Sequence, residues 1–135
     1  MADDLTQPAS ARIRVAVCDD ARAVKYFLRQ VLEEDGDMEV VSTTSSGKEA
    51  LEALTRCRAD ILLLDLLLPD VPEPADLVAR MREQWPAMAI LLMSNMPPAR
   101  LEQEAARLGT DGWTPKANKP AQLRDSVREI IEARA

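Results

Sequence analysis

The amino-acid sequence predicts an α/β domain built on a doubly wound parallel sheet of five strands flanked by five helices. Short apolar runs alternate along the chain with longer segments whose apolar residues recur at helical spacing. The most apolar runs lack in-out alternation, which indicates strands buried on both faces of a parallel sheet. Only 3% of the residues are aromatic, so the core must be mainly aliphatic, as α/β cores are.

Two strands and two helices are expected in the first half of the chain. Residues 13–18 form an apolar strand. Residues 22–35 then show an amphipathic helical stripe made of Val24, Phe27, Leu28, Val31 and Leu32. Residues 38–42 predict a second strand, and residues 46–56 a second helix with its apolar side chains turned inward.

The middle of the chain continues the alternation. A strand is expected at about residues 60–66, where Asp65 interrupts an otherwise apolar run. Pro74 is suited to open a helix that runs to about Gln84, because the first helical position needs no N–H. Residues 88–93 predict the fourth strand.

Three elements complete the chain. Residues 97–108 predict a helix that Gly109 caps. Residues 111–114 form a short fifth strand, and Pro115 just after it is tolerated on a sheet edge. Pro120 starts a final helix with one apolar face.

Length and charge restrict the classes of function. The 135 residues suffice for one domain, which we place at residues 12–133 after a flexible tail at 1–11. A net charge of −6 argues against direct nucleic-acid binding, which needs clustered cations. No apolar stretch approaches the roughly 20 residues that cross a bilayer, and the first twelve residues lack a signal peptide's apolar region.

The cysteines and histidines add two further limits. Cys18 and Cys57 do not form a CxxC motif, so a cytoplasmic location is the simpler expectation. The chain contains no histidine, which excludes histidine acid/base catalysis and the common zinc sites.

Polar residues stand where four of the five strands end. Asp19 and Asp20 follow the first strand, Asp65 lies at the end of the third, Ser94 follows the fourth, and Lys116 follows the fifth. The ligand crevice of an open α/β sheet lies at this edge. Carboxylates that meet there need a cation, and hard oxygen ligands favour Mg²⁺. With a lysine and a hydroxyl nearby, the set is suited to phosphoryl transfer.

These residues, in this order, resemble the response-regulator receiver domain of two-component signalling. The likeness covers roughly residues 12–133 and includes Pro69 after Asp65 and Lys116 within the run from Gly112. It implies a flavodoxin-like receiver fold with strand order 2-1-3-4-5, which sets the first and third strands side by side.

The resemblance implies a phosphoacceptor and its metal. Asp65 would accept the phosphoryl group. Asp20, Asp65 and the backbone carbonyl of Leu67 would ligate Mg²⁺ directly, and Asp19 would act directly or through water. The donor would be a partner histidine kinase or histidine phosphotransfer protein, which agrees with the absence of histidine here.

The same resemblance implies the parts that respond to phosphorylation. Lys116 would pair with the phosphoryl group, and Ser94 would bond one of its oxygens and move toward it. Trp113 would take the place of the switching aromatic residue. Leu67 and Met96 would occupy the positions that tune dephosphorylation. Because apolar side chains cannot orient a water, we expect a long-lived phosphoryl group.

Three residues depart from the family's usual pattern. Glu73 stands where glycine is usual, so the loop before the third helix is expected to be remodelled. Asn95 replaces a small residue and could narrow access to the site. Ala117 replaces the proline that usually follows the lysine, and we expect a trans bond before it because cis would cost several kcal/mol.

The output of the switch stays open at this stage. The chain could act alone through protein contacts, or it could be a receiver cut from a longer helix-turn-helix regulator. The family's usual contact face, formed by the fourth helix, fifth strand and fifth helix, leaves monomer and homodimer both open. On this face we expect Arg100, Glu104, Arg107, Lys119 and Arg124.

Two other classes of function were weighed. A non-phosphorylated interaction module would fit the departures at Glu73 and Ala117 but not the complete acidic set. A Mg²⁺-dependent phosphatase would need a DxD motif, and Asp65-Leu66-Leu67 lacks it. We therefore expect a signalling switch and not an enzyme.

Overall fold

A computed structural model describes residues 12–134, and the tail expected at residues 1–11 lies outside the described residues. Five strands and five helices alternate along the chain: β1 (Ile13–Cys18), α2 (Arg22–Glu33), β2 (Met38–Thr44), α3 (Gly47–Arg56), β3 (Ile61–Asp65), α4 (Pro74–Gln84), β4 (Ala89–Ser94), α5 (Pro98–Leu108), β5 (Gly112–Pro115) and α6 (Pro120–Arg134). All strand pairs are parallel, in the order β2-β1-β3-β4-β5. The predicted fold class and strand order are confirmed.

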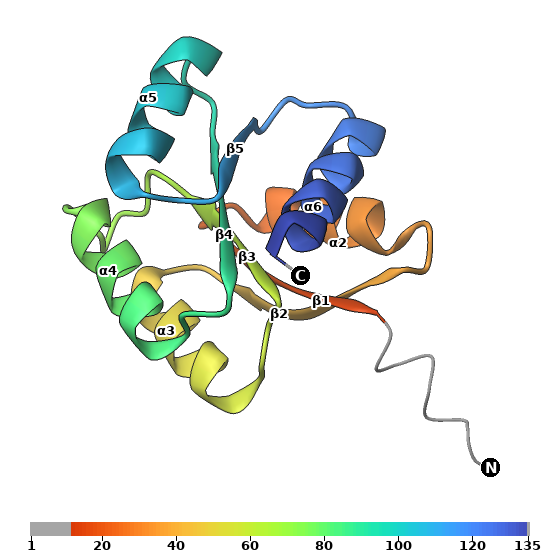
Figure 1. Cartoon of the computed structure of the whole chain (residues 1–135), viewed down its shortest axis with the longest axis horizontal. Coiled ribbons are helices and arrows are strands. Elements are labelled where there is room, and N and C mark those ends of the chain that lie inside the picture. The colour runs from red at the N-terminus through yellow and green to blue at the C-terminus, as the bar shows by residue number, and fades with distance from the viewer. Residues whose placement is uncertain (1–11, 135) are drawn as a thin grey trace.

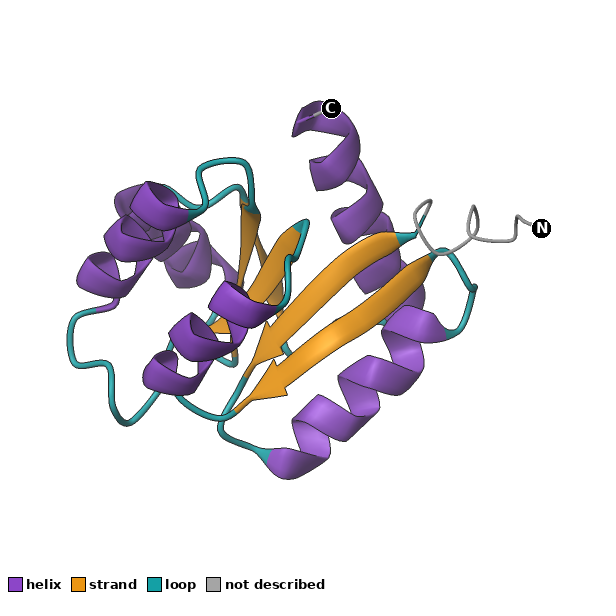
Figure 2. Ribbon diagram, turned by 90° about the horizontal axis from the view of Figure 1, so that it is seen from below, coloured by secondary structure: helices purple, strands orange, loops and turns teal. Residues whose placement is uncertain are grey.

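The helices cover both faces of the sheet (Figures 1 and 2). Helices α2 and α6 lie on one face, and α3, α4 and α5 lie on the other. Every residue of β3 and β4 is buried. Successive residues of β3 enter opposite cores, with Leu62 and Leu64 on the α3–α5 face and Ile61 and Leu63 on the α2–α6 face. A strand apolar on both faces is therefore required in the middle of this sheet.

Two elements, β2 and α2, end two residues from the position that the sequence predicts, and β4 and β5 each end one residue later. Strand β2 continues past Ser42 to Thr44 because β1 still pairs with it there, after a register shift between Val15 and Ala16. Helix α2 ends at Glu33, earlier than expected, because the chain turns through Gly36, whose φ of 83° is left-handed.

Helix ends follow local chemistry. The side chain of Ser46 caps α3 by accepting the N–H of Glu49 at 3.1 Å. Proline occupies the first turn of α4 and of α5. Gly109 closes α5 with a φ of 72°, which confirms the predicted cap.

Two side chains lie differently from the prediction. Phe27 is 49% exposed, because it lies at the border of the α2 stripe and not at its centre, where Leu28, Val31 and Leu32 are buried. Arg124 does not face solvent on the expected contact face. It is buried against α2, and its Nη1 donates a hydrogen bond to the carbonyl of Val31 at 3.0 Å.

None of the helices described here has both the length and the apolar character that a membrane crossing requires.

Candidate phosphoryl-transfer site

The polar residues singled out by the sequence lie at one edge of the sheet. Asp65 is the last residue of β3 and Ser94 the last residue of β4. Asp19 and Lys116 directly follow β1 and β5. Strands β1 and β3 are neighbours, with Cys18 paired to Leu64. The parallel sheet therefore delivers Asp19 and Asp65 to adjacent positions.

Three carboxylates meet there. Asp19, Asp20 and Asp65 each place a carboxylate oxygen within 4.8 Å of the others. Asp19 is fully buried and Asp65 is 4% exposed, whereas Asp20 faces solvent. Two buried carboxylates this close are unfavourable unless positive charge compensates them.

Lys116 supplies part of that charge. Its Nζ lies 2.7 Å from Asp19 Oδ2 and 3.3 Å from Asp65 Oδ2. Its backbone N–H donates to the carbonyl of Ser94 at 3.0 Å, which ties the loop after β5 to the end of β4. Burial lowers the pKa of Lys116, but the close contact with the Asp19 carboxylate and the charge of Asp65 raise it more, so the ammonium stays protonated.

The two oxygens of Asp19 have different surroundings. Oδ1 accepts the backbone N–H of Ala21 at 2.8 Å. Oδ2 is buried and contacts the Lys116 ammonium as an ion pair, but it has no partner at hydrogen-bond angles. A buried oxygen in this condition can take another cation.

Asp65 is held by its own backbone neighbourhood. Its Oδ1 accepts the N–H of Leu67 at 3.1 Å, which leaves Oδ2 on the side of Lys116. Burial raises the pKa of Asp65 above the ordinary carboxyl value, and the Leu67 N–H and the Lys116 charge oppose this rise.

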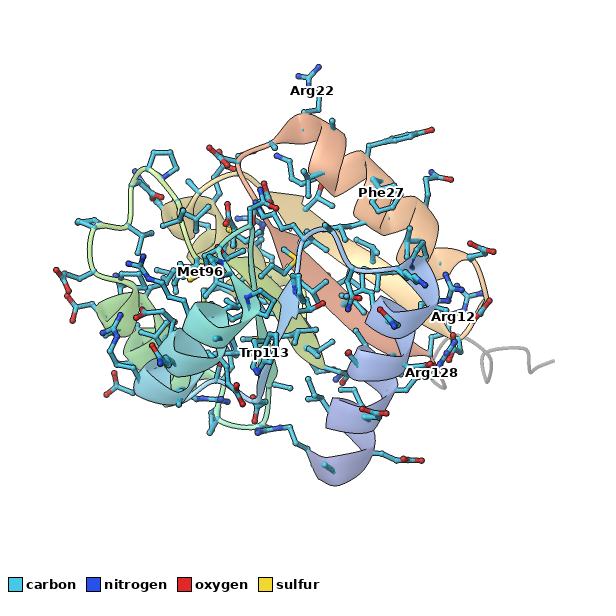
Figure 3. The ribbon with its side chains drawn as sticks, turned by 90° about the horizontal axis from the view of Figure 1, so that it is seen from above. Arg12, Arg22, Phe27, Met96, Trp113 and Arg128 are labelled. Carbon is cyan, nitrogen blue, oxygen red and sulfur yellow. The ribbon has the colours of Figure 1, made fainter. Side chains whose placement is uncertain are left out.

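The remaining residues named from the sequence lie on β4 and β5 and in the loops that follow β3 and β4. Ser94 is buried, and its Oγ accepts the N–H of Met96 at 3.2 Å. Trp113 is half-buried and packs, like Met96, against the core on the α3–α5 face (Figure 3). Leu67 is 68% exposed, and with Met96 it lines a cavity of about 410 Å³ beside α5.

The three departures are accommodated without backbone strain. Glu73 is the N-cap of α4 with a φ of −123°, so this position needs no glycine. Asn95 and Ala117 are exposed. The described residues contain no cis peptide bond, which confirms the trans bond expected before Ala117.

The donor set fits Mg²⁺. Carboxylate oxygens are the hard ligands this ion prefers, and neither histidine nor a thiol takes part in the cluster. The buried Oδ2 of Asp19 is an acceptor without a hydrogen bond. The exposed Asp20 leaves one side of the cluster to water, which Mg²⁺ usually retains.

One residue beside the site was not found from the sequence. Asp70 bonds the start of α3 through its carboxylate. Nothing in the sequence shows which segment this carboxylate would reach.

Known proteins with similar sequences include protein-glutamate methylesterases and response regulators. The protein-glutamate methylesterase/protein-glutamine glutaminase 1 of Paramagnetospirillum magneticum is 28% identical over 94% of this chain and 34% of its own length. The response regulator protein VraR of Staphylococcus aureus is 26% identical over 87% of this chain and 56% of its own length. The chain thus spans between about a third and just over half of these relatives.

Solved structures show the same fold. A LuxR-family two-component response regulator from Aurantimonas matches with a TM-score of 0.81 at 24% identity, over 90% of this chain and 86% of the other. A CheY-like receiver domain from Methanospirillum hungatei matches with a TM-score of 0.78 at 20% identity, over 91% and 96%.

A family model decides the assignment. Residues 15–128 match the model of the response regulator receiver domain, which covers most of the chain and every residue of the acidic pocket. Members of this family are switches of two-component signalling and bind Mg²⁺ at an acidic pocket, and this chain has a cluster of Asp19, Asp20 and Asp65 at the edge of its sheet. The chain therefore belongs to the response regulator receiver family.

Proposed function

We propose that this chain is a phosphorylatable switch in which Asp65 accepts a phosphoryl group from a phosphohistidine of a partner kinase or phosphotransfer protein. One observation carries the proposal. The Lys116 ammonium contacts the buried carboxylates of both Asp19 and Asp65 at the edge of the sheet. This arrangement places a nucleophilic carboxylate beside a cation that can neutralise a phosphoryl oxygen.

The metal would be held by this chain's own oxygens. Carboxylates of Asp19, Asp20 and Asp65 would bind Mg²⁺, together with the backbone carbonyl of Leu67. When bound, Mg²⁺ supplies positive charge to the oxygens of the transferred phosphoryl group.

Transfer requires one bond to form and one to break. An oxygen of the ionised Asp65 carboxylate attacks phosphorus, the P–N bond to the donor imidazole breaks, and its electron pair leaves with the imidazole. Lys116 then pairs with the phosphoryl group, and the hydroxyl of Ser94 donates to one of its oxygens. We expect the Trp113 side chain to repack when Ser94 turns toward the phosphoryl group. In this proposal the chain is a signalling switch that catalyses its own phosphorylation. It works in the reducing cytoplasm.

Intact mass measures the proposed modification. The protein is incubated with Mg²⁺ and a small phosphoryl donor such as acetyl phosphate, and we expect the mass to rise by one phosphoryl group. Asp65→Asn should not gain it, whereas the exposed Asp76→Asn should gain it like the wild type. No gain with any donor would favour a non-phosphorylated interaction module instead.

The lifetime of the phosphoryl group follows from the residues beside it. Leu67 and Met96 present no group that orients a water toward Asp65. We therefore expect decay over minutes or longer, and faster decay in the double variant Leu67→Asn, Met96→Glu. Decay of the wild type within seconds, or equal decay in both proteins, would contradict this reading.

The output is proposed to lie outside the residues described here. One similar solved structure is a two-component response regulator of the LuxR family, and the chain spans only part of the length of the curated relatives it matches. Phosphorylation would change the face formed by α5, β5 and α6, through which a homodimer or an output protein would be engaged. Sedimentation of the phosphorylated and unmodified protein distinguishes these outcomes.

A further inference from the structure

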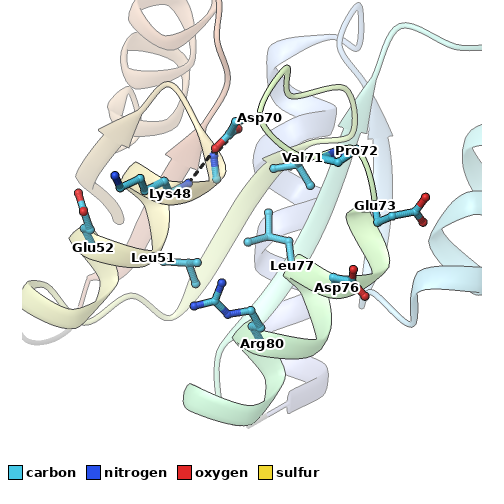
Figure 4. A pocket seen from close by; sticks show the side chains of 11 residues that line it. Lys48, Leu51, Glu52, Asp70, Val71, Pro72, Glu73, Asp76, Leu77 and Arg80 are labelled. Atoms are coloured by element: carbon cyan, nitrogen blue, oxygen red, sulfur yellow. Dashed lines mark hydrogen bonds between the residues drawn. The ribbon is translucent and has the colours of Figure 1, made fainter.

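A carboxylate outside the acidic pocket has two well-placed partners. A cavity of about 510 Å³ lies between α3 and the segment that joins β3 to α4 (Figure 4). At its edge Asp70 Oδ1 accepts the N–H of Gly47 at 3.0 Å, and Oδ2 accepts the N–H of Lys48 at 3.2 Å. These groups lie in the first turn of α3, where the helix offers no acceptor of its own.

Asp70 and Ser46 share the capping of α3. The Ser46 hydroxyl takes the N–H of Glu49, and Asp70 takes the two N–H groups before it. The Asp70 carboxylate also places negative charge at the positive end of the helix dipole. The N–H groups hold the pKa of Asp70 below its usual range, the one from Gly47 most strongly, so the link persists at neutral pH.

Asp70 lies at the tip of a stiff turn. The N–H of Val71 donates to the carbonyl of Leu68 at 3.0 Å, which places Pro69 and Asp70 in the centre of a β-turn. Proline at the second position of such a turn fixes its φ in advance. Pro72 follows at once, so residues 66–73 have few ways to bend.

Gly47 at the start of α3 allows the turn to pack closely against this helix, because glycine has no Cβ. A Cβ placed on Gly47 would lie 2.6 Å from Val71 Cγ2 and 3.3 Å from Leu77 Cδ2. Carbon atoms do not pack at 2.6 Å, so a side chain at Gly47 would displace Val71 from its present position beside the helix start. The segment is thus fixed to α3 by a polar contact and by an apolar one.

The other end of the same segment touches Asp65. The N–H of Leu66 donates to the carbonyl of Met93 at 2.9 Å, and the N–H of Leu67 donates to Asp65 Oδ1 at 3.1 Å. The segment thus connects Asp70 at one end to the N–H that orients Asp65 at the other.

We infer that Asp70 is a positioning residue for phosphoryl transfer, since it fixes residues 66–73 against α3 and so keeps the Leu67 N–H on Asp65. The inference rests on the proposed function of Asp65. On this view the rate at which Asp65 is phosphorylated depends on the loop of residues 66–73 as well as on the acidic pocket.

Amide hydrogen exchange tests the placement without any phosphoryl donor. In Asp70→Ala we expect the Leu67 amide to exchange at least about tenfold faster, while the buried Leu63 amide of β3 keeps its wild-type rate. Asp70→Asn retains one acceptor oxygen, so its Leu67 amide should exchange at a rate between those of the wild type and Asp70→Ala. Asp76→Ala removes another carboxylate of the same cavity and should leave Leu67 unchanged. Unchanged Leu67 exchange in Asp70→Ala would overturn the inference.

Phosphorylation rates test the consequence. At saturating donor and Mg²⁺ we expect Asp70→Ala to phosphorylate about tenfold more slowly, because a misplaced nucleophile lowers the maximal rate. Gly47→Ala displaces the same turn from the other side and should show the same loss, measured per folded molecule. A loss of thermal stability with no change in maximal rate would assign Asp70 a structural role only and overturn the inference.

The two hypotheses fail in different ways. A wild-type protein that takes up no phosphoryl group from any donor would overturn the proposed function and this role together. Uptake by the wild type at a rate that Asp70→Ala and Gly47→Ala share would overturn the role alone.

Discussion

Lys116 contacts two buried carboxylates, and this contact determines what its removal does. In Lys116→Met, Asp19 and Asp65 would face each other with no cation between them. We expect the free energy of unfolding to fall by about 1–3 kcal/mol in the absence of divalent ions, as for a lost charged hydrogen bond. Mg²⁺ should then stabilise the variant more than it stabilises the wild type, because it binds the native carboxylates only.

Urea unfolding with EDTA and with Mg²⁺ measures both effects. Lys119→Met is the matched control, since Lys119 is exposed three residues away and makes no ion pair among the described residues. An equal response to Mg²⁺ in wild type and Lys116→Met would refute the compensating role of the ammonium.

The two cysteines differ in reactivity for a physical reason. Cys18 is fully buried, and burial raises the pKa of its thiol to about 11. The thiolate is the reactive form, so we expect iodoacetamide at pH 8 to modify the half-buried Cys57 and to spare Cys18 in the native protein. Peptide mass spectrometry gives the answer, and unfolding in urea should make both react. Rapid labelling of native Cys18 would show that β1 opens locally.

At the level of single residues, the sequence identified the acidic pocket but not its support. Asp65 is recognisable as a charge inside a leucine run. Lys116 is recognisable as a candidate site residue because it directly follows a predicted strand. Asp70 and Arg124 gave no such signal. Their partners are the start of α3 and the carbonyl of Val31, which are brought near only by the tertiary fold.

At the level of elements, two arginines join α6 to the end of α2. Arg128 pairs with Asp35, Asp37 and Asp125 at the surface. Arg124 is buried and bonds the Val31 carbonyl. Exposed ion pairs are screened by water, whereas a hydrogen bond from a buried charged group contributes more to stability.

We therefore expect Arg124 to contribute more to the free energy of unfolding than Arg128, although Arg128 has more ionic partners. Arg124→Ala should lower the free energy of unfolding by about 1–3 kcal/mol, and Arg128→Ala by less than about 1 kcal/mol. Guanidinium chloride screens ion pairs, so urea is the denaturant to use. The opposite ranking would show that the surface cluster acts as a network.

The elements themselves were largely predictable, and their limits were not. Gly109 after α5 and the prolines in the first turns of α4 and α5 fix those boundaries through backbone chemistry that the sequence displays. Strand β2 runs on through polar residues to Thr44, because its pairing with β1 decides its length. The order of the strands came from the family resemblance, since periodicity alone does not say which strands are neighbours.

At the level of the whole molecule, Asp111 links three elements at the edge of the sheet opposite the site. Its Oδ2 accepts the N–H of Ile90 at 2.7 Å and lies 2.8 Å from Arg82 Nη2 of α4. Its Oδ1 accepts from Arg134 Nη1 of α6 at 2.7 Å. One carboxylate thus joins helices on both faces to β4, which makes its charge a determinant of global stability.

This charge predicts a pH dependence. Burial acts to raise the pKa of Asp111, but the Ile90 N–H and the two arginines outweigh it and hold the pKa below the ordinary value. The native state therefore binds fewer protons than the unfolded chain, whose Asp titrates near about 3.9. The stabilisation is present above that pH and is lost as the pH falls through the lower native pKa.

Asp111→Asn, which has no charge to lose, should lower the free energy of unfolding by about 2 kcal/mol at pH 7. Urea unfolding at pH 7, 5 and 3 should show this difference constant between pH 7 and 5 and smaller at pH 3. A difference that stays the same at pH 3 would mean that packing, and not charge, is what Asp111 contributes.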